Sequence, residues 1–279
     1  MRTNQLLFLF LFLMTQLTFS QTIVENKSDR NTKIEKELSG IITDTIQKEK
    51  HLSSHLKGTT LKYEQIYFIL GTLSDYMGRF QYVARVKQVD RYYPSEKPLV
   101  NYLTAYIKTE LNIQVDTIFE KSNNCKMYSK QLSEKLNSYY GNQDELINNK
   151  FETNEQIYSF LAGVYYRYGE KLDTSIYKIQ LSNSPKHQNC YDFLKRIGCK
   201  KIFYKYLNNI PAQYILYFEP TDEFKNYLNL IESDRLILQQ SNNRQIEEMM
   251  KGQTKKDELE KKIQKSRQLA LESVKNAFK

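Results

Sequence analysis

The most regular pattern of apolar and polar positions lies between residues 154 and 218. Apolar side chains recur at helical spacing from residue 157 onward, on one face of a predicted α-helix. They are Ile157, Phe160, Leu161, Val164, Tyr165 and Tyr168. Thr153 and Gln156 stand just before this face in the order of a capping box. Gly169 follows where a left-handed C-terminal cap is expected.

A short helix and three β-strands are predicted after this helix. Residues 175–181 alternate roughly between apolar and polar side chains, which is typical of a strand with one buried face. Ser184 and Pro185 match the N-cap and the first-turn proline of a second helix, which ends at Gly198. Residues 202–218 contain two runs of β-branched and aromatic side chains around a short polar break, so they predict a β-hairpin.

The same helical pattern occurs once earlier in the chain, at an offset of 91 residues. Residues 64–67 align with residues 155–158, and the alignment continues without a gap through Gly78 and Gly169 to Leu103 and Leu194. The apolar faces of the two segments also agree, as expected for a duplicated unit. Identity between the segments is low, so an internal duplication and a chance match both stay open.

Helical spacing and strand-like runs predict elements in the rest of the chain. The predicted helices are 33–56, 63–77, 99–111 and 125–140, and the predicted strands are 81–89 and 113–119. Thr221, Asp222 and Glu223 form a helix start in which an N-cap is followed by two acids that complement the helix dipole. A helix is predicted from there to about Met250, and a second, charged helix is predicted over 255–278.

Together these elements predict an α+β protein that is dominated by helices. It contains a possible tandem pair of helix–strand–helix units, a small sheet and a C-terminal helical tail. The predicted segments are a signal peptide (1–20), an N-terminal helical segment (21–60), a first α+β unit (61–150), a second α+β unit with the β-hairpin (151–220) and the helical tail (221–279).

The N-terminus has the pattern of a secretory signal peptide. Arg2 precedes an apolar run over residues 6–14 that is too short to span a bilayer. Thr18 and Ser20 supply small side chains at the −3 and −1 positions of a cleavage site before Gln21. An N-terminal anchor is the alternative. The expected location is therefore secreted or periplasmic/cell envelope, with no transmembrane span after signal removal.

The chain is mildly basic. Its 41 Lys and Arg residues exceed its 32 Asp and Glu residues, and the formal net charge is +9, or +8 without Arg2. The basic residues are spread along the chain. This balance favours a protein or an anionic surface as partner. Nucleic acid is not expected as a partner, because a dense basic stripe is absent and export is predicted.

Three cysteines enter the predicted oxidising compartment. An odd number leaves at least one thiol free or paired between chains. Cys190 and Cys199 bracket one short predicted helix, and a helix of two turns or more would place their Cα atoms beyond the reach of a disulfide, about 7 Å. A disulfide between them and buried free thiols are the two alternatives, and Cys125 has no evident partner.

Two small groups of residues are weak candidates for chemistry. His51 and His55 are four residues apart on a predicted helix, so both imidazoles share a face and could bind a metal. Solvated surface histidines are the simpler interpretation, since no third ligand is nearby. His187 and Cys190 are three apart at a predicted helix start, where a thiolate and an imidazole could serve in catalysis. Cys190 also lies on the apolar face, which favours a core cysteine.

No catalytic motif is present in the sequence. The nucleophile elbow, the dinucleotide-binding fingerprint and the phosphate-binding loop do not occur. We therefore expect an exported envelope or secreted protein that acts as a non-catalytic binding module for a partner protein or an anionic surface, without a cofactor. The alternative is an exported hydrolase or thiol enzyme whose site is assembled from distant residues, so enzymatic activity stays open.

Overall fold

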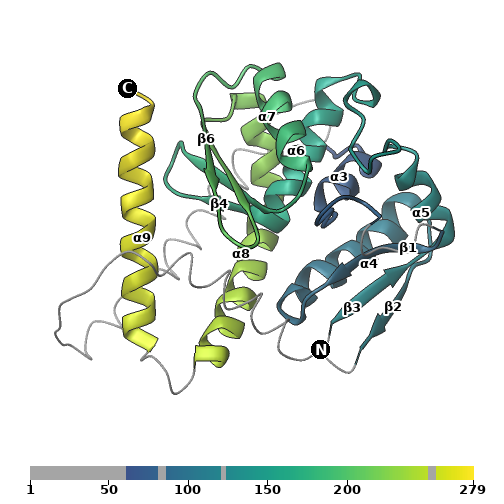
Figure 1. Cartoon of the computed structure of the whole chain (residues 1–279). Coiled ribbons are helices and arrows are strands. Elements are labelled where there is room, and N and C mark those ends of the chain that lie inside the picture. The colour runs from purple at the N-terminus through teal and green to yellow at the C-terminus, as the bar shows by residue number, and fades with distance from the viewer. Residues whose placement is uncertain (1–60, 81–85, 121–123, 251–255) are drawn as a thin grey trace. The chain divides into compact units, whose positions relative to one another are not determined.

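The computed structural model describes residues 61–80, 86–120, 124–250 and 256–279 (Figure 1). The predicted signal peptide, the segment 21–60 and the candidate metal ligands His51 and His55 lie outside the described residues. The described residues from Tyr63 onward belong to one unit. The domain boundaries expected within that unit stay a prediction.

Seven α-helices are described in these ranges. They are α3 (Gln65–Thr72), α4 (Lys97–Leu111), α5 (Lys130–Asn137), α6 (Asn154–Tyr168), α7 (Lys186–Arg196), α8 (Asp222–Met250) and α9 (Lys256–Ala277). Two short 3-10 helices, η1 (Pro94–Glu96) and η2 (Asn148–Lys150), accompany them. The helix-dominated α+β class expected from the sequence is confirmed.

The strands form two antiparallel sheets. The first contains β1 (Gln88–Tyr92), β2 (Asp116–Phe119) and β3 (Cys125–Tyr128) in the order β1-β3-β2. The second contains β4 (Gly169–Lys171), β5 (Tyr177–Ser182), β6 (Ile202–Leu207) and β7 (Gln213–Phe218) in the order β4-β5-β7-β6. The predicted β-hairpin is therefore present as β6 and β7, and β6 is an edge strand.

The helix expected over residues 125–140 is wrong in its first part, which forms β3. Cys125 and Met127 are buried and alternate with half-buried neighbours, so they face the core from the middle strand of the first sheet. The helix α5 begins only after Ser129, whose side chain accepts a hydrogen bond from the backbone N–H of Leu132. Strand pairing on both sides of β3 overrides the local helical pattern.

The helix expected over residues 63–77 is also shorter than its pattern indicates. α3 ends at Thr72 because Leu73 is extended, with φ −64° and ψ 148°, and Asp75 and Met77 then adopt positive φ angles of 44° and 59°. Non-glycine residues rarely adopt this conformation. Thr72, the last residue of α3, is fully buried.

The helix α6 has the bounds that the sequence predicts. Thr153 and Gln156 form the expected capping box, with the Thr153 hydroxyl accepting from the Gln156 N–H at 3.3 Å and the Gln156 side chain accepting from the Thr153 N–H at 3.2 Å. The left-handed cap expected at Gly169 is wrong. Gly169 is extended, with φ −98° and ψ 160°, because it already belongs to β4.

The two helices α3 and α6 cross in close backbone contact through a pair of glycines (Figure 1). A Cβ atom added to Gly163 would lie 3.2 Å from the Cα atom of Gly71 and would overlap the carbonyl oxygen of Phe68. A Cβ atom added to Gly71 would lie 2.8 Å from the backbone nitrogen of Val164 and would overlap the carbonyl oxygen of Phe160. Side chains of any size are therefore excluded from both positions.

This contact is reciprocal. Gly163 faces the carbonyl oxygen of Phe68, three residues before Gly71, and Gly71 faces the carbonyl oxygen of Phe160, three residues before Gly163. Gly71 and Gly163, like Phe68 and Phe160, are 92 residues apart. The offset of 91 residues that the sequence favours therefore differs by one residue from the offset seen in the helix contact. The duplication itself stays a prediction.

Two clusters of buried apolar side chains hold the described elements together. The larger cluster surrounds α3 and α6 and includes the inward faces of both sheets. The smaller cluster lies on the other face of the second sheet, where Ile215 and Tyr217 pack with Val274 of α9. The helix α9 therefore packs on the second sheet through Val274, which is 1% exposed.

We predict that Gly163→Ala destabilises the fold by about 3 kcal/mol or more, because the helix backbones must separate to admit the methyl group. This loss would exceed the gain of up to about 1 kcal/mol that alanine has over glycine inside a helix. Urea denaturation measures the free energy of unfolding.

Gly141→Ala is the matched control. An added Cβ atom at Gly141 would meet the carboxylate of Glu145, which is exposed and can rotate away. We expect a change below about 1 kcal/mol at this position. Equal effects of the two substitutions would contradict the tight crossing of α3 and α6.

Candidate functional site

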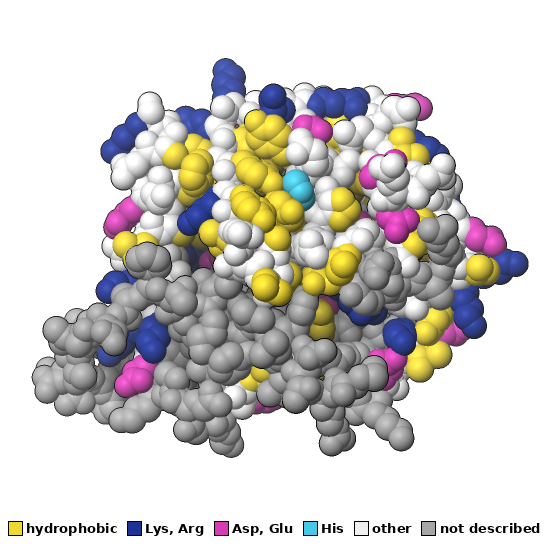
Figure 2. Space-filling model, viewed as in Figure 1, with side chains coloured by type: hydrophobic (Ala, Val, Ile, Leu, Met, Phe, Trp, Pro, Cys, Tyr) yellow, Lys and Arg dark blue, Asp and Glu magenta, His cyan; other side chains and the backbone are white. Residues whose placement is uncertain are grey.

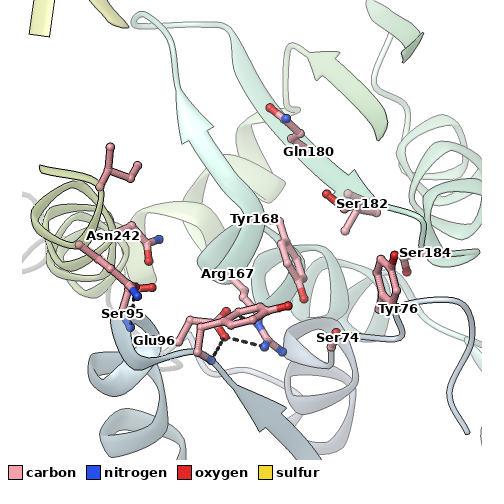
Figure 3. Close-up of a pocket in the computed structure, with 14 residues that line it drawn as sticks. Ser74, Tyr76, Ser95, Glu96, Arg167, Tyr168, Gln180, Ser182, Ser184 and Asn242 are labelled. Carbon is pink, nitrogen blue, oxygen red and sulfur yellow. Dashed lines mark hydrogen bonds and ion pairs between the residues drawn. The ribbon is translucent and has the colours of Figure 1, made fainter. Parts of the chain in front are cut away.

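A cavity of about 200 Å³ lies at the C-terminal ends of the two crossed helices (Figure 3). Its walls come from the segment after α3, from η1, from the end of α6, from β5 and from α8. Three tyrosines line it, Tyr76, Tyr93 and Tyr168, together with four serines and three side-chain amides. Neutral hydrogen-bonding groups and aromatic rings therefore make up most of the wall.

The charged groups in this wall are Glu96 and Arg167, and they bind each other. Arg167 Nε donates to Glu96 Oε1 at 2.7 Å, and Arg167 Nη2 donates to Glu96 Oε2 at 2.9 Å. Arg167 Nη1 also donates to Asp90 Oδ2 at 2.6 Å. Burial alone would lower the pKa of Arg167, but the neighbouring carboxylates, above all Glu96, hold that pKa well above its usual value.

A second buried ion pair lies at the C-terminal end of α3. The ammonium group of Lys186 lies 3.2 Å from Asp75 Oδ2 and also donates to the carbonyl oxygens of Leu70, Gly71 and Leu73. These carbonyls lie at the helix C-terminus, where a cation complements the helix dipole. Lys186 and Asp75 are both almost fully buried. α7 is thereby tied to α3.

A group of aromatic side chains lies on the surface beside α7. We define the aromatic surface as His187 and Tyr191 of α7, Tyr204 and Tyr206 of β6, and Tyr214 of β7. The rings of His187 and Tyr214 stack with a centroid distance of 3.7 Å, and Tyr204 Oη lies 3.0 Å from His187 Nδ1. In Figure 2, hydrophobic side chains gather around a histidine on this face.

His187 and Cys190, the candidates for catalysis, have different surroundings. His187 is half-buried in the aromatic surface, and burial lowers its pKa below the usual value. Cys190 is fully buried in the larger core cluster, and burial raises the pKa of its thiol to about 12. The contacts of His187 are with Tyr204 and Tyr214. A role for this pair in catalysis stays a prediction.

All three cysteines are free and buried. Of the two alternatives for Cys190 and Cys199, the structure shows free thiols. Burial raises the pKa of Cys199 to about 11 and raises the pKa of Cys125 as well.

Two further features concern metal binding and membrane spans in the described residues. No group of three or more His, Cys, Asp or Glu side chains that could hold a metal ion is found among them. None of the helices in the described ranges is long and apolar enough to cross a membrane.

The sequence analysis identifies neither the cavity nor the aromatic surface. The aromatic surface leaves one signal in the sequence, because Tyr204 and Tyr206 alternate with Lys205 in a predicted strand and must share a face. The cavity leaves no such signal, since its residues come from five separate segments.

No protein-family model matches the sequence, and no curated protein is similar to it. Solved structures with a partly similar backbone include I-DmoI in complex with DNA and Mn, with a TM-score of 0.41 and 14% identity over 60% of this chain and 94% of that chain. The N-terminal LAGLIDADG domain of DUF199/WhiA has a TM-score of 0.36 and 17% identity, over 60% of this chain and 80% of that domain. Full-length DUF199/WhiA from Thermatoga maritima has a TM-score of 0.39 and 15% identity, over 65% and 63% of the two chains.

These structures correct the prediction about partners. One of them is a complex with DNA, which contradicts the expectation that nucleic acid is not a partner. The expectation rests on the predicted export and on the lack of a dense basic stripe in the sequence. The second criterion misses single basic residues that lie beside aromatic rings, such as Lys195, whose Nζ lies 5.5 Å from the centroid of the Tyr191 ring.

The predictions of function and location are corrected by the same structures. The exported, non-catalytic module for a protein or an anionic surface is contradicted, and export, which the alternative enzyme also requires, is not supported. The secreted or periplasmic/cell-envelope location is wrong on the same finding. It was inferred from the apolar pattern of residues 1–20 alone, which lie outside the described residues.

We predict that the thiols react very slowly with iodoacetamide in the native protein. The thiolate is the reactive form, and a pKa of about 12 leaves Cys190 almost entirely protonated at pH 8. Intact-mass spectrometry should show almost no label before unfolding and three labels in denaturant. Rapid labelling of Cys190 in the native protein would contradict its place in the core.

Proposed function

We propose that the chain binds single-stranded nucleic acid through the aromatic surface. The observation that supports this proposal is the set of exposed and stacked rings on α7, β6 and β7. Tyr206 is 51% exposed and Tyr204 is 36% exposed, so part of each side chain is open to solvent. Bases of a single strand stack on such rings regardless of sequence, because every base has a π-face.

The geometry of β6 suits successive unpaired bases. Tyr204 and Tyr206 are two residues apart on one strand, so their side chains project from the same face roughly 7 Å apart. That spacing allows each ring to take its own base from an extended strand. Base pairing and stacking hide base faces inside a duplex, so this surface should prefer unpaired strands.

Basic side chains border the rings and supply contacts for phosphates. Lys195 Nζ lies 5.5 Å from the centroid of the Tyr191 ring. Lys200 is exposed just before the edge strand β6. In Figure 2, Lys and Arg side chains lie along the upper edge of the same face. Basic groups beside stacking rings are the combination that tracks a single-strand backbone.

We predict that Tyr206→Ala weakens binding of a fluorescein-labelled oligothymidylate by about 5- to 150-fold. This range corresponds to about 1–3 kcal/mol for one base–aromatic stack. Fluorescence anisotropy measures the dissociation constant. Affinity for the labelled strand should also fall steeply as salt concentration rises, since phosphate contacts release counterions.

Phe119→Ala is the matched control for Tyr206→Ala. Phe119 is 52% exposed, but it belongs to β2 of the other sheet. Its loss should leave binding unchanged. Equal binding of the same strand as a duplex, or unchanged binding by Tyr206→Ala, would refute the proposal.

We further predict that binding of the oligothymidylate tightens as pH falls through the pKa of His187. That pKa lies below the usual value because of burial, so the ring is neutral at pH 7. Protonation would add a cation to the aromatic surface, and bound phosphates would favour the protonated form. Anisotropy titrations across pH 5 to 7 should show this gain in the wild-type protein but not in His187→Gln. An equal gain in affinity in both proteins would mean that groups other than His187 cause the pH dependence.

A further inference from the structure

The two charged side chains in the wall of the cavity at the ends of α3 and α6, Arg167 and Glu96, are paired with each other. All five N–H groups of a guanidinium are accounted for in Arg167. They donate to Glu96, to Asp90 and to the carbonyl oxygens of Thr72 and Arg91. Glu96 also accepts from the backbone N–H of Tyr93 at 2.8 Å. Neither charge is available to an ion in the cavity.

The remaining wall offers ring faces and neutral hydrogen-bonding groups. Tyr76 projects toward the cavity from the segment after α3, and Tyr168 projects toward it from the end of α6 (Figure 3). Gln180 of β5 and Asn242 of α8 contribute amides. Ser184 is 2% exposed and lines the cavity, and its hydroxyl has no hydrogen-bond partner among the described residues. The Ser184 hydroxyl oxygen is itself enclosed, so the hydrogen bonds open to a ligand come from the amides.

The size of the cavity limits the ligand to a small molecule. Pockets for drug-sized ligands measure roughly 300–1,000 Å³, whereas this cavity measures about 200 Å³. A molecule of one or two rings is therefore the appropriate size. Tyrosine rings favour a flat ligand, and amides and hydroxyls favour one with both donors and acceptors on its edge.

We propose that this cavity binds a small, uncharged, planar heterocycle that carries both hydrogen-bond donors and acceptors, the chemical class to which free nucleobases belong. The ring lies against the tyrosines, and its edge bonds to the amides of Gln180 and Asn242. The cavity and the aromatic surface share no residue. The proposal is thus independent of strand binding, and small molecules alone test it.

Isothermal titration calorimetry of the full chain with adenine and with uracil tests the proposal. At least one of them should bind with a dissociation constant of about 1 mM or tighter. Benzoate and benzamidine are charged rings of similar size, and both should bind at least tenfold more weakly. No saturable binding of either base, or equal binding of a charged ring, would overturn the proposal.

Substitutions on α8 locate the site. Asn242→Leu removes an amide from the cavity wall and fills part of the space, so it should weaken binding of the base at least tenfold. Asn243→Leu is the matched control, because Asn243 is exposed on the same helix and does not line the cavity. Ser182→Val on β5 provides a second wall variant in case Asn242→Leu lowers Tm. Unchanged binding in both wall variants would overturn the location.

Discussion

The close crossing of α3 and α6 is the contact on which the rest of the structure depends. α3 has eight residues, and isolated helices shorter than about 12–15 residues are marginal in water. Its helical state therefore comes from packing against α6, which Gly71 and Gly163 permit by leaving room for backbone contact. Both sheets in turn pack their inward faces around this pair of helices.

The crossing also fixes what lies at the helix ends. Arg167 lies in the last turn of α6. Its guanidinium binds Asp90 of β1, Glu96 of η1 and the carbonyl oxygen of Thr72 in α3, so it joins three other segments to α6. Desolvation offsets much of the Coulomb energy of such buried pairs, whereas removing one partner leaves a buried charge uncompensated. The network therefore specifies the arrangement around the cavity more than it adds to net stability. It also explains why neither charged side chain in the cavity wall is available to an ion.

Local patterns in the sequence predict the elements whose stability is local. The capping box of Thr153 and Gln156 and the apolar face that follows it predict both ends of α6, and the runs around Pro211 predict the β-hairpin. β3 escapes prediction because four residues carry too little pattern, and its strand state depends on pairing with β1 and β2. The candidate sites escape as well. Arg167 and Asp90 are 77 residues apart, and no pattern in the sequence relates them.

Native-state amide hydrogen exchange tests the dependence of the fold on the helix crossing most directly. If α3 is held by α6, the buried amides of both helices should exchange only through global unfolding, with the same opening free energy across a urea series. The buried amides of the strands that face the larger core cluster should show this same opening free energy. Exchange of the α3 amides through a local opening of much lower free energy, while α6 stays protected, would contradict the account.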